Sequence, residues 1–239
     1  MSDQRKMPTM FKKLFTVLND ILRSRQAIFG SDLTTKNDRQ LALAHLRYFD
    51  HGILRDRWTN LEQITVGVWR SNQPNPCQIA HYASIGIKTI LSLRGAGNSS
   101  HYLLEKEACS AQGVRLVTLS LNARKAAPKE RYLALLDLFE TIEHPFLFHC
   151  KSGADRTGLA AVFYLLHMEN VPLSIARKQL GLKYIHIRWL KTGVLDKILD
   201  AYAADINRNG SIQLRHWIEH NYDPDQITRS FKRYFVKII

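Results

Sequence analysis

The chain has 239 residues, 45% of them hydrophobic and 23% charged, which supplies enough apolar material for one sizeable folded core. Its 34 basic and 21 acidic residues give a formal charge of +13, which favours anionic partners such as phosphorylated ligands or an acidic membrane face. No stretch reaches the roughly 18 consecutive apolar residues of a membrane-spanning helix, and no apolar signal core opens the chain. We therefore expect a cytoplasmic protein that is neither secreted nor transmembrane.

Three cysteines, Cys77, Cys109 and Cys150, are odd in number and lie far apart in the sequence. They form no C-x-x-C pair, and no histidine spacing near them is typical of a zinc site. The pattern predicts a reducing environment with free thiols, and we expect neither a metal nor a cofactor.

The first part of the chain predicts a helical extension, residues 1–50. Apolar residues recur at helical spacing from Phe11 to Leu22, and lysines occupy other faces of that helix. Such a basic amphipathic helix suits an anionic membrane, which would place the protein peripherally at the inner membrane surface. The alternative is that this helix packs on its own domain or on a second copy. A polar linker, Gly30 to Arg39, and a second helix, about Leu41 to Phe49, complete the extension.

The main domain, residues 51–239, shows short strands and helices in alternation. Each of "ITVGVWRS", "IKTILSLRG", "VRLVTLSL" and "PFLFH" predicts one strand, and helices are expected from Pro76, over "YLLEKEACSAQG", from Pro128, over "TGLAAVFYLLHME" and over "PLSIARKQLG". The tail from Thr192 reads as largely helical. This alternation of strands and helices predicts an α/β fold with a mixed, mostly parallel central sheet flanked by helices and preceded by the helical extension.

Cys150 directly follows the strand "PFLFH", at the carboxyl end of that strand. Open α/β sheets bind ligands at this edge. A tight loop there, followed by a helix N-terminus, directs backbone N–H groups at one spot that suits a phosphate. The same donors stabilise a thiolate, so Cys150 is a candidate nucleophile with a lowered pKa. Arg156 can hold two phosphoryl oxygens, Gly153 lets the backbone turn, and Thr157 can donate its hydroxyl to the sulfur.

These residues resemble a known signature. His149, Cys150, Gly153, Arg156 and Thr157 match H-C-x-x-G-x-x-R-[ST], and the chain is similar over roughly residues 61–200 to the dual-specificity branch of the protein tyrosine phosphatase superfamily. The resemblance implies a metal-independent reaction through a cysteinyl-phosphate.

The resemblance also implies a role for each residue of the loop. Cys150 would be the nucleophile, Arg156 the phosphate clamp and Thr157 the hydroxyl that assists the leaving thiolate. His149 would order the loop from behind. The residues that would bind the substrate phosphate are Lys151, Ser152, Gly153, Ala154 and Arg156.

One element of the family pattern is absent. Most members carry a general-acid aspartate on a mobile loop upstream of the cysteine, but the corresponding stretch, "LSLNARKAAPKE", has Asn122 and no aspartate. Asp155, inside the loop, is the first candidate for the acid, because C-x-x-x-x-D-R resembles the loops of lipid and phosphoinositide phosphatases. Two alternatives are that Asp155 only hydrogen-bonds loop amides, and that Glu130 supplies the proton.

The sequence leaves the substrate open between phosphoproteins and phospholipid head groups. The loop aspartate, Lys151 beside the nucleophile and the basic N-terminal segment favour lipid or small acidic substrates, with peripheral contact to an anionic membrane. Nucleic acid is not expected. Two other functions compete: a non-catalytic phosphate-binding pseudophosphatase, and a rhodanese-like sulfurtransferase.

Overall fold

A five-stranded sheet forms the centre of the computed structural model, which describes residues 31–238 and the side chains up to Phe231. The strands are β1 (Glu62–Thr65), β2 (Val68–Ser71), β3 (Thr89–Ser92), β4 (Arg115–Thr118) and β5 (Phe146–His149), in the order β1-β2-β5-β3-β4. β2, β5, β3 and β4 are parallel neighbours, and only β1 is antiparallel. The predicted mixed, mostly parallel sheet is confirmed.

The segment "ITVGVWRS" was expected to form one strand, and that prediction is wrong. Thr65 pairs with Val68, so the chain reverses over two residues and forms the β1–β2 hairpin. Gly67 has a φ of 75°, a left-handed conformation that glycine adopts without steric cost. The hairpin places β1 at the edge of the sheet, where it shields β2 from solvent.

Helices follow the strands as expected. They are α4 (Pro76–Ser84), α5 (Ser100–Ala111), α6 (Lys129–Thr141), α7 (Asp155–His167), α8 (Leu173–Ala176), α9 (Val194–Asn209), α10 (Leu214–His220) and α11 (Pro224–Ile238). Three 3-10 turns are η2 (Arg177–Gln179), η3 (Leu182–Tyr184) and η4 (Lys191–Gly193). The helix predicted over "PLSIARKQLG" is shorter, because α8 ends at Ala176 and continues as η2. At the end of η2 the Gln179 carbonyl accepts a hydrogen bond from Arg70 at 2.7 Å.

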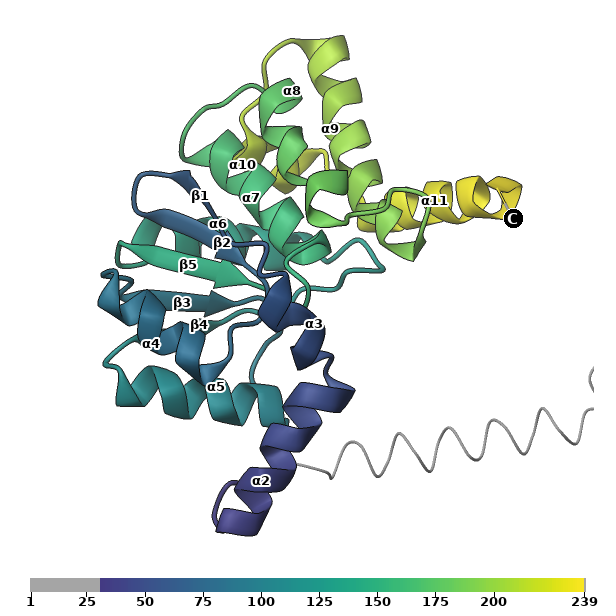
Figure 1. Cartoon of the computed structure of the whole chain (residues 1–239). Helices are drawn as coiled ribbons and strands as arrows, with labels where there is room; N and C mark the ends of the chain where they lie inside the picture. The colour runs from purple at the N-terminus through teal and green to yellow at the C-terminus, as the bar shows by residue number, and fades with distance from the viewer. Residues whose placement is uncertain (1–30, 239) are drawn as a thin grey trace, which may run out of the picture.

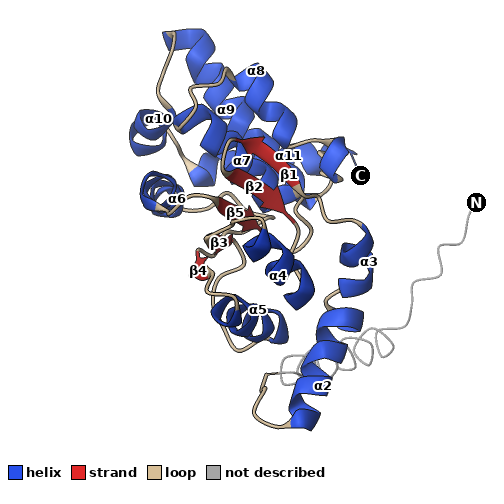
Figure 2. Ribbon diagram, turned by 60° about the vertical axis from the view of Figure 1, so that its left-hand side comes forward, coloured by secondary structure: helices blue, strands red, loops and turns tan. Residues whose placement is uncertain are grey.

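Two hydrophobic layers cover the sheet (Figures 1 and 2). On one face α4 and α5 pack over Ile90 and Leu147, with Ile79, Tyr82 and Cys109 in the same cluster. The larger core, on the other face, gathers α6, α7, α9 and α10 over buried aromatic residues of β5 and α6. Because helices cover both faces, β5 is buried along its whole length, and its first three residues, Phe146, Leu147 and Phe148, are apolar.

The described part of the N-terminal segment packs on the main domain. α2 (Lys36–Ala44) is capped by Thr35, so the helix begins inside the stretch that was expected to be a linker. A π-helix, η1 (His45–Phe49), and α3 (Gly52–Arg57) continue it, and Ala42 and Leu46 cluster with Leu104 of α5. The division of the chain at residue 50 stays a prediction. The helix expected from Phe11 to Leu22 lies outside the described residues.

Within residues 31–238, none of the helices combines the length and the apolar character that crossing a bilayer requires.

Candidate active site

The loop after β5 places Cys150 at the carboxyl edge of the sheet. β5 pairs with β2 on one side and β3 on the other, with His149 level with Ser71 and Ser92. Three strand ends therefore meet behind the loop, residues 150–154. α7 begins directly after it, so the free N–H groups and the positive end of the helix dipole lie beside the cysteine.

Gly153 is the one position of this loop where a side chain cannot be accommodated. Its φ is 72°. A Cβ there would lie 2.8 Å from the Ser71 carbonyl oxygen and 2.9 Å from the Asn72 nitrogen, far closer than atoms pack. The loop can therefore pass this close to the end of β2 only with glycine.

The thiol of Cys150 is buried, with 1% of its surface exposed. Burial alone would raise its pKa, but the Arg156 guanidinium and a hydrogen bond from the Thr157 side chain outweigh burial and lower the pKa below the usual value. The thiolate is therefore favoured at the base of the loop, where a cysteine nucleophile is needed. The sequence predicted this pairing of Cys150 with Arg156 and Thr157.

Arg70 and Asn60 hold the loop from outside. The Arg70 guanidinium donates to the Gly153 carbonyl at 2.5 Å and lies 3.5 Å from the centre of the Tyr184 ring. Asn60 donates through Nδ2 to the carbonyl oxygens of Ser152 at 2.8 Å and of Tyr184 at 3.1 Å. These bonds join the loop to the 182–190 segment. Arg70 thus has a structural role, and no motif in the sequence pointed to Asn60.

His149 contacts a buried carboxylate behind the loop. Its Nε2 lies 2.6 Å from Oε1 of Glu105 on α5, and both side chains are inaccessible to solvent. The Nδ1 atom lies 3.2 Å from the Cys150 carbonyl oxygen. The imidazole thus connects α5 to the backbone of Cys150, an arrangement that fits the ordering role expected of it.

Asp50 forms ion pairs with three cationic side chains beside the loop. This buried carboxylate pairs with Arg55 at 2.7 Å, with Arg94 at 2.8 Å and with Lys151 at 3.1 Å. Burial would raise its pKa, but hydrogen bonds and charge from Arg94, Arg55 and Lys151 hold the pKa well below its usual range. Lys151 is therefore held by the N-terminal segment, and Asp50 is a site residue that the sequence analysis missed.

Asp155 shares a histidine with a second aspartate. His186 lies 2.7 Å through Nδ1 from Oδ1 of Asp155, and 2.7 Å through Nε2 from Oδ2 of Asp196. Burial would lower the pKa of His186, but its hydrogen bonds to Asp155 and Asp196 raise the pKa to about 9. The ring is therefore charged at neutral pH, and it fixes one oxygen of Asp155.

A cavity of about 1240 Å³ opens over the loop. Lys151, Ser152, Ala154, Asp155 and Arg156 form its base. The rest of its wall comes from residues 51–60, from the loop after β4 and from the end of the 182–190 segment: His51, Ile53, Leu54, Arg55, Arg57, Trp58, Asn60, Leu121, Asn122, Ala123, Arg124, Tyr184, Ile185 and Thr192. The alternative acid, Glu130, does not line this cavity.

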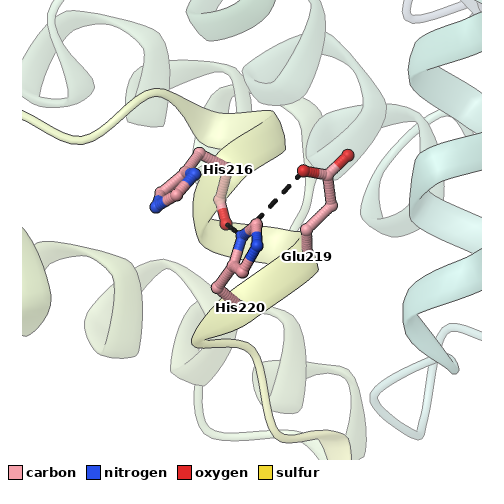
Figure 3. A group of neighbouring side chains, drawn as sticks. All are labelled: His216, Glu219 and His220. Atoms are coloured by element: carbon pink, nitrogen blue, oxygen red, sulfur yellow. Dashed lines mark hydrogen bonds and ion pairs between the residues drawn. The ribbon is translucent and has the colours of Figure 1, made fainter.

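One group of described side chains has the composition of a metal site. His216, Glu219 and His220, which share α10, bring ligand atoms within 4.8 Å of one another (Figure 3). The two imidazole rings stack with their centres 4.3 Å apart. None of these residues lines the cavity over Cys150, so the group takes no part in the site described above.

Comparison with known proteins agrees with the residues of the loop. The model of the tyrosine phosphatase family matches residues 65–177. This range contains β2 to β5, the loop and α7, but only the last residue of β1. An inositol diphosphatase of Arabidopsis thaliana, DSP4, is 29% identical over 104 residues, which are 41% of this chain and 51% of the relative. The chain thus spans about half the length of this curated relative.

Solved structures with similar chain folds include bacterial and yeast proteins. TpbA of P. aeruginosa is 19% identical, with a TM-score of 0.47 and coverage of 73% of this chain and 91% of its own. The core catalytic domain of SIW14 of S. cerevisiae is 18% identical, with a TM-score of 0.43 and coverage of 73% and 92%.

Proposed function

We propose that the protein is a metal-independent, cysteine-dependent phosphomonoesterase, because residues 65–177 match the model of the tyrosine phosphatase family. The observation that carries the proposal is the buried Cys150 thiol, whose pKa is lowered by Arg156 and Thr157 at the start of α7. A protein that only bound phosphate would gain nothing from an activated thiol, which argues against a pseudophosphatase.

In the first step of the proposed reaction, the Cys150 thiolate attacks the phosphorus and forms an S–P bond. The bond from phosphorus to the leaving oxygen breaks, and that oxygen takes a proton from the Asp155 carboxyl group. Arg156 and the loop N–H groups bind the three phosphoryl oxygens and stabilise the charge that develops on them.

In the second step a water molecule attacks the cysteinyl-phosphate and gives its proton to Asp155. The S–P bond breaks, inorganic phosphate leaves, and the Thr157 hydroxyl stabilises the released thiolate. Asp155 suits both steps because it lines the cavity and has one oxygen fixed by His186.

The proposed substrates are phosphomonoesters of proteins or of phospholipid head groups. The base of the cavity offers Lys151 and Arg156, and its wall adds Arg57 and Arg124, which suits a dianionic group. A free catalytic thiol needs reducing surroundings, and Cys77, Cys109 and Cys150 are all unpaired, which supports the proposed cytoplasmic location.

The test is phosphate release from p-nitrophenyl phosphate by the full chain and by Cys150→Ser and Arg156→Lys variants. We expect turnover by the wild type in the presence of EDTA, loss of turnover in Cys150→Ser, and a large loss in Arg156→Lys because lysine lacks the bidentate fork. Cys109→Ser, which alters a buried cysteine of α5 outside the cavity, is the matched control. Activity that survives Cys150→Ser would refute the mechanism.

A further inference from the structure

Exposed large apolar side chains are concentrated in two segments that flank the active site. In the described part of the chain, thirteen such residues are exposed. Six of them lie in residues 43–58 and four in residues 182–190: Leu43, Tyr48, Phe49, Ile53, Leu54, Trp58, Leu182, Ile185, Trp189 and Leu190. Single exposed apolar residues are common on folded proteins, but this concentration in two segments is not.

The two segments meet at the mouth of the cavity. Ile53, Leu54 and Trp58 line the same cavity as Ile185, although more than a hundred positions separate them in the sequence. Asn60 holds the segments together, because it accepts a hydrogen bond from the Trp58 indole at 2.8 Å and donates to the Tyr184 carbonyl at 3.1 Å. α3 lies beside the carboxyl ends of the strands in both ribbon views (Figures 1 and 2). Four of the ten exposed apolar side chains therefore line the cavity over Cys150, and the other six lie in the same two segments.

Cations accompany these apolar residues. Arg47 and Arg57 are exposed in the first segment, and Arg124 is exposed on the cavity wall. Lys191 is exposed directly after the second segment. Aromatic and aliphatic groups next to arginine and lysine match the boundary of an anionic bilayer, where rings enter the head-group layer and cations meet lipid phosphates.

We propose that residues 43–58 and 182–190 form a docking face for an anionic lipid bilayer, and that the substrate is a phosphomonoester head group presented by that bilayer. The substrate part of this proposal rests on the proposed function. The docking face does not depend on that function and can be tested separately. An acidic phosphopeptide fits these observations less well, because it would need hydrogen-bonding partners along an extended backbone, whereas this surface is dominated by apolar side chains.

The position of the docking face determines how a lipid substrate would reach the cavity. A bilayer that contacts both segments covers the cavity mouth, so a lipid head group can enter the cavity while its acyl chains stay in the membrane. The volume of about 1240 Å³ exceeds the usual range for small-molecule sites, which leaves room for a head group beside the phosphate.

The experiment measures binding of the full chain to vesicles by co-sedimentation, and its activity on lipid and soluble substrates. Vesicles of phosphatidylcholine alone are compared with vesicles containing about 30 mol% phosphatidylglycerol, and phosphatidic acid is the lipid substrate. The test variant combines Tyr48→Ser, Trp189→Ser and Leu190→Ser, none of which lines the cavity. The control is Val66→Ser, an exposed residue in the β1–β2 turn, at the opposite end of β2 from the loop.

We expect binding to the anionic vesicles only, and a loss of at least roughly tenfold in affinity and in phosphatidic acid turnover for the triple variant. Its p-nitrophenyl phosphate turnover should match that of the wild type, and Val66→Ser should change nothing. If the wild type lacks p-nitrophenyl phosphate activity, the proposed function fails, while vesicle binding still tests the docking face.

Three results would overturn the docking proposal. The first is that an active wild type does not bind the anionic vesicles. The second is that the triple variant binds as tightly as the wild type, while deletion of residues 1–30 abolishes binding, which would assign membrane contact to that segment. The third is that the triple variant loses turnover of a phosphotyrosine peptide but keeps turnover of phosphatidic acid, which would assign the face to a protein substrate.

Discussion

His186 holds the carboxylate of Asp155, with 2.7 Å between its Nδ1 and Oδ1 of the aspartate. The same ring contacts Asp196 at the start of α9 through Nε2, so the candidate acid is attached to the C-terminal half of the domain. Only one oxygen of Asp155 is fixed in this way. The histidine can therefore set the orientation of the carboxylate at the edge of the cavity.

The role of Asp155 can be read from the dependence of the rate on the leaving group. Expelling an alkoxide needs a proton, whereas nitrophenolate leaves without one. We expect Asp155→Asn to lower the rate on an alkyl phosphate by about 10²–10⁴ and the rate on p-nitrophenyl phosphate far less. An equal decrease in both rates would mean that Asp155 only shapes the loop. The Glu130→Gln variant would then be measured in the same assay.

The charge on His186 should make the stability of the domain depend on pH. Its pKa is about 9 in the folded protein and about 6.5 in an unfolded chain. The histidine therefore contributes stability that is complete below about pH 6.5 and is lost as the pH rises through about 9. Urea unfolding should show a larger loss for His186→Gln at about pH 6 than at about pH 10. His81→Gln, at an exposed site, should show no such difference.

Cys150 should react as a thiolate in mildly acidic solution. We expect iodoacetate to label Cys150 near pH 6 and phosphate to protect it, because both anions bind in the loop of residues 150–154. Mass spectrometry of the labelled chain identifies the site. Burial raises the pKa of Cys109 to about 12, so that thiol should stay unlabelled. Labelling that begins only above about pH 8, or that phosphate does not reduce, would contradict the activated thiol.

Asp50 should stabilise the loop through the cations that it gathers. Asp50→Asn removes the carboxylate that pairs with the buried Arg55 and the half-buried Arg94, and we expect a loss of about 3 kcal/mol in the free energy of unfolding at pH 7. Because the pKa of Asp50 is lowered, its contribution is present above the unfolded value of about 4 and falls as the pH drops below that value.

The difference between the wild type and Asp50→Asn should therefore shrink in acid. Asp56→Asn, which changes an exposed carboxylate that accepts a hydrogen bond from Asn75, serves as the control. A difference that stays constant down to about pH 3 would mean that packing, and not charge, accounts for the loss.

The sequence alone determined the alternation of strands and helices and the loop with Cys150, Gly153, Arg156 and Thr157. It could do so because these features are local. A strand followed by a glycine turn and a helix N-terminus brings residues within eight positions of one another to one spot, wherever the rest of the chain lies. The hairpin at Gly67 was missed because a glycine inside an apolar run is read as part of one strand.

The tertiary structure alone decided which residues support this loop. Asn60 reaches the Ser152 carbonyl across 92 positions and the Tyr184 carbonyl across 124, and His186 reaches Asp155 across 31. Asp50 similarly meets Lys151 only because η1 packs beside α5. No spacing in a sequence records such contacts, since they depend on how whole helices pack on the sheet. The apolar mouth of the cavity arose in the same way, from two segments that only the packed fold brings together.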